Sequence, residues 1–198
     1  TGIGSDSRIG YQFIYPGVGY GGSCFPKDVK ALIHTAEKAG VEPKLLNAVE
    51  DVNARQKKHM ATRIMEYFAP QGGVQGKTLA LWGLAFKANT DDMREAAAIS
   101  IINELTAAGM RVRAFDPVAA DNARAIFKDN PLVEVGTDQY EVCRGAQALL
   151  VVTEWNQFRN PDFEKVRGLL SAPLLFDGRN LYSPSSMAEH GFAYFCIG

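Results

Sequence analysis

The chain has 198 residues, of which 46% are hydrophobic and 22% charged, and its formal net charge is −1. This composition is typical of a globular protein with room for one large or two small domains. Because basic residues are not in excess, nucleic-acid or anionic-membrane binding is not indicated, and no apolar run approaches the ~20 residues that a membrane-spanning helix needs.

The three cysteines, Cys24, Cys143 and Cys196, are too few and too widely spaced for a disulfide framework or a metal site. We predict that Cys143 and Cys196 are core residues. The start of the chain shows no signal-peptide pattern, so we expect a cytoplasmic protein that holds no metal. The chain opens at Thr1 rather than at methionine, which suggests a piece of a longer protein.

A glycine-dense loop leads into the first predicted helix. Four glycines lie within six residues, at positions 17, 19, 21 and 22, so the backbone can take positive φ and approach a ligand closely. Pro26 suits the first turn of a helix, and Cys24 then lies at the positive end of that helix with Lys27 nearby. This position favours the thiolate, which makes Cys24 a candidate nucleophile.

Two other interpretations of this loop stay open. Gly17, Gly19 and Gly22 match the G-x-G-x-x-G pattern of dinucleotide-binding loops. Residues 11–15 would make a poor buried strand before such a loop, however, and Pro16 interrupts them. A lone cysteine is also more often an inert core residue than a nucleophile. The glycine loop, the helix-opening proline and the neighbouring lysine together favour the nucleophile.

Two helices are predicted next. Apolar residues recur at helical spacing from Pro26 to about Lys38, and Gly40 follows as a stop. A second helix is predicted from about Lys44 to Phe68. Roughly 25 residues of helix span about 40 Å, which is long for one small domain.

The motif Pro70-Gln71-Gly72-Gly73 ends the helical pattern and predicts a domain boundary. Residues 1–72 would form a helical segment, and residues 73–198 a second domain. In the second domain, short apolar runs alternate with helical stretches, which predicts an α/β fold with a Rossmann-like, doubly wound parallel sheet. Ligands of such sheets bind at the carboxyl ends of the strands. The predicted strands are Thr78–Trp82, Val112–Phe115, Val133–Val135, Ala148–Val152, Leu174–Phe176 and Phe192–Cys196, and the predicted helices lie near Arg94–Ala108, Ala119–Lys128, Gln139–Arg144, Pro161–Leu170 and Pro184–His190.

The loop after the first predicted strand carries Lys87 and Arg94. Asp92 and Glu95 have the spacing of a capping box that opens the next helix, which favours a structural role for these carboxylates. Arg94 in the first turn of that helix would oppose the helix dipole unless an anion lies near it. Asp91, Glu95 or a phosphate would supply that anion.

Three further strand ends carry polar residues. Because the first turn is not glycine-rich, Asp116 is interpreted as a turn residue rather than as the ribose-binding acid of a Rossmann domain. Glu154 and Trp155 either line the cleft or pack at its rim. Arg179 lies at the carboxyl end of the fifth predicted strand.

Two motifs carry a resemblance to a known family. Residues 21–28, Gly-Gly-Ser-Cys-Phe-Pro-Lys-Asp, resemble the catalytic-cysteine signature of the UDP-glucose/GDP-mannose dehydrogenase family. Phe86-Lys87 with residues 90–95 is similar to the second signature of that family. The likeness spans essentially the whole chain, but the family's amino-terminal NAD-binding domain has no counterpart in it. Residues 15–20, Tyr-Pro-Gly-Val-Gly-Tyr, most resemble the members that act on UDP-glucose.

The resemblance implies an activity. Those enzymes oxidise the 6-hydroxymethyl group of a nucleotide sugar to a carboxylate in two NAD-dependent steps. Cys24 would be the nucleophile, and Lys27 and Asp28 would tune or orient the cysteine and a water. NAD is the implied cofactor, contacted by Lys27 and, at its pyrophosphate, by Arg94.

The resemblance also implies a UDP-sugar site and a homodimer. Lys87 would contact the nucleotide sugar, Arg179 would help to hold the nucleotide, and Arg8 would reach into the neighbouring subunit's site. The helix over residues 44–68 would form much of the dimer core. The expected substrate-binding residues are Arg8, Phe13, Tyr15, Gly17, Gly19, Tyr20, Gly21, Phe86, Lys87 and Arg179.

Alternatives to this function stay open. The cysteine loop is shared by the dehydrogenases of UDP-N-acetylmannosamine and GDP-mannose. Without the NAD-binding domain, the chain by itself is expected to be inactive, so it would serve as a nucleotide-sugar-binding and dimerisation module. A thiol acyltransferase that pairs Cys24 with a distant histidine is a third class.

Overall fold

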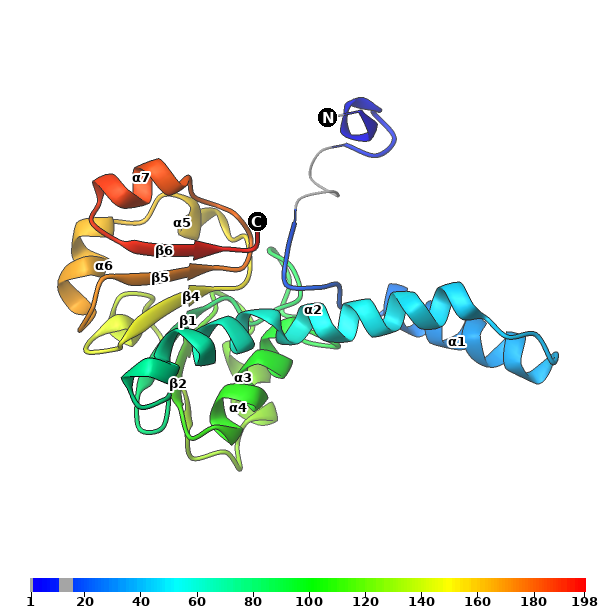
Figure 1. The fold of residues 1–198 in the computed structure, drawn as a ribbon, viewed down its shortest axis with the longest axis horizontal. Coiled ribbons are helices and arrows are strands. Elements are labelled where there is room, and N and C mark those ends of the chain that lie inside the picture. The colour runs from blue at the N-terminus through cyan, green and yellow to red at the C-terminus, as the bar shows by residue number, and fades with distance from the viewer. Residues whose placement is uncertain (1, 11–15) are drawn as a thin grey trace.

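The structure, a computed structural model, describes residues 2–10 and 16–198. Its first long elements are α1 (Phe25–Lys38) and α2 (Lys44–Phe68), whose bounds agree with the predicted helices to within one residue. Pro26 lies in the first turn of α1, where its missing N–H leaves no helical hydrogen bond unmade. Figure 1 shows α1 beside the first half of α2, and both extend away from the sheet.

Only the second half of α2 is anchored in the α/β domain. Its buried residues from Asn53 to Phe68 follow one helical stripe, with Ala61 beside Met60, and the helix packs against α3 (Ala97–Ala107). On α1 and the first half of α2, by contrast, Leu32 and Leu45 are 55% and 77% exposed. Residues 25–52 therefore form a projecting helical arm.

Six parallel strands form one sheet in the order β3-β2-β1-β4-β5-β6. The chain enters at the centre of the sheet and winds outwards in both directions, so the strand order reverses between β1 and β4. This confirms the predicted doubly wound parallel sheet. The strands are β1 (Thr78–Trp82), β2 (Arg111–Phe115), β3 (Val133–Val135), β4 (Ala148–Val151), β5 (Leu174–Asp177) and β6 (Ala193–Cys196).

Helices cover both faces of this sheet. Side chains alternate between the faces along each strand, and both faces carry apolar side chains that are buried. Leu79 and Leu81 of β1 pack with α2, α3 and α4 (Ala120–Ile126), whereas Ala80 and Trp82 pack with the elements on the opposite face. Those elements are the 3₁₀ turn η4 (Glu141–Cys143) and the helices α5 (Asn156–Arg159), α6 (Phe163–Leu169) and α7 (Pro184–Glu189). Two more 3₁₀ turns are η1 (Ile3–Ser5) and η3 (Ala69–Gln71).

The start of α3 corrects the sequence-based prediction. The helix begins at Ala97 rather than at Arg94, and its N-cap, Ala96, makes no side-chain capping bond. Glu95 has φ 54°, a left-handed conformation that a helix cannot contain. The capping box of Asp92 and Glu95 is therefore wrong, because both carboxylates bind cations elsewhere. The predicted helix over 139–144 is also only the single turn η4.

The two cysteines expected in the core differ. Cys143 is fully buried, and this burial raises the pKa of its thiol to about 12. Cys196 is only partly buried, because β6 is the edge strand of the sheet. Among the described residues, no helix combines the length and the apolar character that crossing a bilayer requires.

Candidate active site

The glycine loop before Cys24 docks onto the loop between β1 and α3. The amide of Gly22 donates a hydrogen bond of 2.8 Å to the carbonyl oxygen of Arg94. A β-carbon on Gly21 would overlap the carbonyl oxygen of Glu95, and one on Gly22 would lie 2.9 Å from the ring of Phe86. Glycine at both positions permits this close approach, as the glycine density predicts.

The same loop also contacts Arg179 and α2. A β-carbon on Gly17 would overlap the guanidinium of Arg179, and the Gln56 side chain donates a 2.7 Å hydrogen bond to the Gly17 carbonyl. Gly19 has φ 101°, and a β-carbon there would lie 2.8 Å from Oδ1 of Asn53. The loop thus lies between α2 and the carboxyl ends of the strands.

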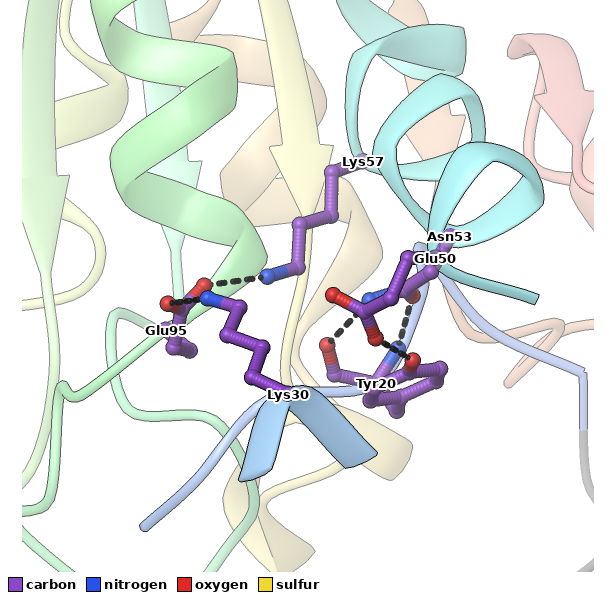
Figure 2. A network of polar contacts seen from close by, with 6 residues as sticks. All are labelled: Tyr20, Lys30, Glu50, Asn53, Lys57 and Glu95. Carbon is purple, nitrogen blue, oxygen red and sulfur yellow. Dashed lines mark hydrogen bonds and ion pairs between the residues drawn. The ribbon is translucent and has the colours of Figure 1, made fainter. Parts of the chain in front are cut away.

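Asn53 and Glu50 of α2 fix Tyr20 (Figure 2). Oδ1 of Asn53 accepts a 2.8 Å hydrogen bond from the amide of Tyr20, and Nδ2 donates a 3.2 Å bond to the Tyr20 carbonyl. The Tyr20 hydroxyl donates to Glu50. Burial and, next, the Glu50 carboxylate raise the pKa of Tyr20 to about 12. The Tyr20 hydroxyl is therefore bound to α2, so its predicted contact with substrate would come from the ring or the backbone.

Cys24 is exposed at the N-cap position of α1, as the helix-opening proline predicts. Its sulfur lies 3.6 Å from the hydroxyl of Ser23. Lys27 and Asp28, in the first turn of the helix, form a 3.4 Å ion pair with each other and are both largely exposed. These side chains border one solvent-accessible end of α1.

Arg94 is held by Asp92, its neighbour two residues before. Nε and Nη2 of Arg94 donate hydrogen bonds of 2.9 and 2.8 Å to the two carboxylate oxygens of Asp92. This bidentate pair and the charge of Asp92 raise the pKa of Arg94, and a thiolate at Cys24 is near enough to add to the rise. The anion beside Arg94 is thus Asp92, neither Asp91 nor Glu95. The Arg94 side chain is still 70% exposed.

Glu154 joins Arg179 to the loop that carries Lys87. Its Oε2 forms a 3.0 Å ion pair with Nη2 of Arg179, and its Oε1 accepts a 3.3 Å hydrogen bond from the amide of Ala88. Both charged side chains are largely buried. Lys87, the residue before Ala88, is exposed, with its ammonium 5.3 Å from the ring centre of Phe86. Glu154 therefore holds Arg179 against the loop after β1, and its lining of a ligand cleft stays a prediction.

Asp116 has the structural role that its strand-end position predicts. One carboxylate oxygen accepts hydrogen bonds from the amides of Leu84 and Ala85 and from the indole of Trp155. The other accepts from the amides of Val118 and Ala119. With all these donors, and at 2% exposure, the carboxylate is not available to a ribose. Trp155 itself is buried in the hydrophobic core on one face of the sheet.

In the described part of the chain, Arg8 makes no polar contact with this site. The guanidinium of Arg8 pairs with Asp6 at 2.7 Å, and 87% of its side chain is exposed. Its reach into a neighbouring subunit stays a prediction. Phe13 and Tyr15 lie outside the described residues.

The sequence analysis did not single out Asn53 or Lys57, assigned Glu95 to a capping box, and left the role of Glu154 open. A signal for the first two was present. Asn53 and Lys57 lie on the same helical stripe as Met60 and Ile64, and a polar residue on a buried apolar stripe indicates a specific partner. Glu154 was recognised only as one of two residues at a strand end.

Comparison with protein families decides the family of the chain. The model described as "UDP-glucose/GDP-mannose dehydrogenase family, UDP binding domain" matches residues 80–184. The central-domain model of the same family matches residues 1–55. The chain belongs to the UDP-glucose/GDP-mannose dehydrogenase family.

Relatives within this dehydrogenase family match the whole chain. A UDP-glucose 6-dehydrogenase of Pseudomonas aeruginosa is 52% identical over 200 residues, covering 100% of this chain and 44% of that protein. One of Rhizobium meliloti is 42% identical with the same coverage of both. The structure of a UDP-glucose dehydrogenase from Pyrobaculum islandicum has a TM-score of 0.77 at 30% identity, covering 100% of this chain and 41% of the other. The chain thus spans less than half the length of these relatives.

Proposed function

We propose that the chain is the part of a UDP-glucose 6-dehydrogenase that supplies the catalytic cysteine and the nucleotide-binding edge. One observation carries the proposal: the loop before Cys24 is bonded, through Gly22, to the loop that bears Lys87 and Arg94. This contact supports a candidate nucleophile near the carboxyl ends of the strands, where a doubly wound sheet binds ligands.

The substrate would be held by charged groups around the glycine loop. Arg179 and Lys87 would bind the diphosphate and sugar of a UDP-sugar, because a guanidinium and an ammonium both pair well with phosphate oxygens. Glu154 would keep Arg179 in place while the ligand is absent. Arg8 would complete the site of the neighbouring subunit.

Cys24 would perform the covalent step. Its thiolate attacks the carbonyl carbon of a C6 aldehyde, a C–S bond forms, and the carbonyl oxygen takes up a proton to give a thiohemiacetal. After oxidation to a thioester, water adds to the same carbon and the C–S bond breaks, releasing the carboxylate and the thiolate. Covalent attachment retains a reactive aldehyde between the two oxidations. Lys27 and Asp28, at the same end of α1, would orient the cysteine and the water.

NAD would be the cofactor of the whole enzyme. Arg94 fits one part of it, because an exposed guanidinium can bind the oxygens of a pyrophosphate in pairs; Lys27 is the second expected contact. The sheet itself does not fit the dinucleotide, since Asp116 is already bonded to its surrounding loops. When bound, NAD would supply the oxidising power for both oxidations as a hydride acceptor.

The helical arm would form a homodimer. Phe25, Leu32, Leu45 and Val52 on this arm are 55–77% exposed. Beside Val52, an apolar groove of about 400 Å³ runs along α2 next to the glycine loop. Burial of this surface by a second copy would stabilise the dimer. Replacing Leu45 and Val52 together by glutamate should convert a dimeric wild type into a monomer in sedimentation velocity. A variant that stays dimeric would show that this arm is not the interface, and a monomeric wild type would contradict the dimer.

Alkylation of Cys24 tests the proposed site. Iodoacetamide at neutral pH should label Cys24, as peptide mass mapping would detect, and UDP-glucose should slow the labelling. Cys143 is the internal control because it is buried. Labelling without protection by UDP-glucose would favour the acyltransferase reading.

The identity of the sugar requires a separate comparison. A ligand that binds the folded chain raises its thermal stability by RT ln(1 + [L]/Kd). We expect UDP-glucose to stabilise the chain more than UDP-N-acetylmannosamine or GDP-mannose. Mixed with UDP-glucose and NAD, the chain alone should produce no NADH.

A further inference from the structure

Glu95 joins three parts of the molecule that lie far apart in the sequence (Figure 2). Its Oε1 accepts a 2.6 Å hydrogen bond from the ammonium of Lys30 on α1. Its Oε2 accepts a 3.0 Å hydrogen bond from the ammonium of Lys57 on α2. Both contacts are ion pairs. Each carboxylate oxygen thus binds a different helix, and the proposed chemistry uses none of these three side chains.

The backbone at Glu95 has an unfavourable conformation. A φ of 54° is strained for a residue with a β-carbon, and glycine would adopt it more easily. The same residue presents its carbonyl oxygen to Gly21 of the cysteine loop. A glutamate in this strained turn indicates that its side chain has a specific task.

Helix α1 packs beside α2 but makes few contacts with the α/β domain itself (Figure 1). Pro26 and Val29 are its only buried residues. Over residues 2–10 and 16–198, the Lys30–Glu95 bond is the one side-chain hydrogen bond between α1 and the α/β domain. Cys24 immediately precedes this helix, so the position of its sulfur depends on the position of α1.

Lys57 anchors the carboxylate of Glu95 to α2. Only 10% of the Lys57 side chain is exposed, so its ammonium requires an anionic partner. Hydrogen bonds from Lys30 and then from Lys57 hold the pKa of Glu95 below its usual value. The carboxylate is therefore charged at neutral pH and anchored to α2 when Lys30 binds it.

We propose that Glu95 is a positioning residue for Cys24: by binding Lys30 and Lys57 together, it holds the helix that begins beside the cysteine against the loop that carries Lys87 and Arg94. The inference rests on the proposed role of Cys24 and deepens it. Without this bridge, α1 moves relative to the loop, and the sulfur of Cys24 loses its fixed distance from Arg94.

The test uses three variants of the whole chain. Lys30→Met removes only the bond between Glu95 and α1, and Glu95→Gln removes the carboxylate that both lysines share. Glu104→Gln is the matched control, because it breaks a 2.6 Å ion pair between Lys58 of α2 and Glu104 of α3 that does not involve α1. Two quantities are measured: amide hydrogen exchange by residue, and the pH profile of Cys24 alkylation by iodoacetamide.

We expect exchange in α1 and at the Gly22 amide to rise about threefold to tenfold in Lys30→Met and Glu95→Gln, which is the range that a partly exposed ion pair and local opening allow. The strands should not change. The alkylation profile should move to higher pH in both variants. Loss of the Lys30 charge would by itself move the profile to higher pH, whereas loss of the Glu95 charge would by itself move it to lower pH. A shift to higher pH in both variants therefore indicates that the sulfur of Cys24 has moved away from Arg94. Lys30→Arg should restore both measurements.

Unchanged α1 exchange and an unchanged alkylation profile in Lys30→Met would overturn the proposal. If Glu95→Gln does not fold, Lys30→Met still decides, because the Lys30 side chain is 53% exposed and its loss leaves the core intact. Neither measurement uses a nucleotide sugar. A failure of UDP-glucose to protect Cys24 would therefore count against the proposed function and not against the positioning role.

Discussion

Gly17 lies directly against the guanidinium of Arg179, so closely that a β-carbon at position 17 would overlap it. This contact joins the start of the glycine loop to the carboxyl end of β5, across more than 160 positions of the sequence. The absence of a side chain at residue 17 thus sets where the expected nucleotide-binding arginine can lie.

Gly17→Ala should weaken UDP-glucose binding with little effect on folding. The alanine methyl displaces the flexible end of the Arg179 side chain, which can move without breaking the core but then leaves Glu154. Binding is measured by titration calorimetry and folding by thermal melting. Gly168→Ala is the control, since a β-carbon there meets nothing within 4 Å. Equal affinity in Gly17→Ala and wild type would show that Arg179 does not bind the nucleotide.

Gly21→Ala should have a larger effect, because its methyl group meets backbone rather than a mobile side chain. The obstacle is the carbonyl group of Glu95. The glycine loop must therefore lift from residues 94–95, which breaks the Gly22–Arg94 hydrogen bond. Faster hydrogen exchange at the Gly22 amide, compared with Gly168→Ala, is the expected observation. Exchange at the wild-type rate would mean that the loop accommodates the methyl group.

Asp116→Asn should destabilise the fold by about 2 kcal/mol or more, because hydrogen bonds to a buried charged group contribute about 1.5–3 kcal/mol. The carboxylate accepts four backbone amides and the indole of Trp155. An asparagine would turn an N–H₂ group toward some of these donors. Urea unfolding measures the change. Asp121→Asn, at a side chain that is 95% exposed, should have almost no effect.

The Glu95 bridge predicts an acid-dependent loss of stability. In the folded state, hydrogen bonds from Lys30 and then from Lys57 lower the pKa of Glu95 below its ordinary value of 4.5. The charged form is therefore favoured by folding. The contribution of Glu95 to the free energy of unfolding is fully present when the pH is above the pKa of the unfolded state. It is lost as the pH falls through the lower pKa of the folded state. The charge of Glu50 on α2 also belongs to this cluster, because it contributes to raising the pKa of Lys30 and of Tyr20.

The measurement compares the free energy of unfolding of wild type and Glu95→Gln between pH 7 and pH 3. The two free energies of unfolding should differ most at neutral pH and should converge when the pH falls below the ordinary pKa of a glutamate. A difference that stays constant over this range would show that the carboxylate charge does not contribute.

Much of the fold could be read from the sequence because its signals are local. The 3.6-residue spacing of apolar side chains predicted α1 and α2, and alternating apolar runs and helices predicted the parallel sheet. The glycine density and Pro26 likewise indicated a tight loop that ends at the start of a helix. Each of these signals depends on residues within a few positions of one another.

The start of α3 shows where local signals fail. Asp92 and Glu95 have capping-box spacing, yet Asp92 binds Arg94, and Glu95 takes a left-handed conformation and binds Lys30 and Lys57. Two long-range ion pairs outweigh one local cap. A sequence pattern over four residues cannot register partners that lie 38 and 65 positions away.

The sequence by itself determined the elements, the sheet type and the cysteine loop, since backbone propensity and side-chain periodicity act over short distances. Only the tertiary structure decided which of the charged side chains meet: Arg179 with Glu154, and Glu95 with two helices. Such meetings depend on how α2 packs across the sheet and on where each strand ends. Those distances arise when the core closes, and no short segment of the chain contains them.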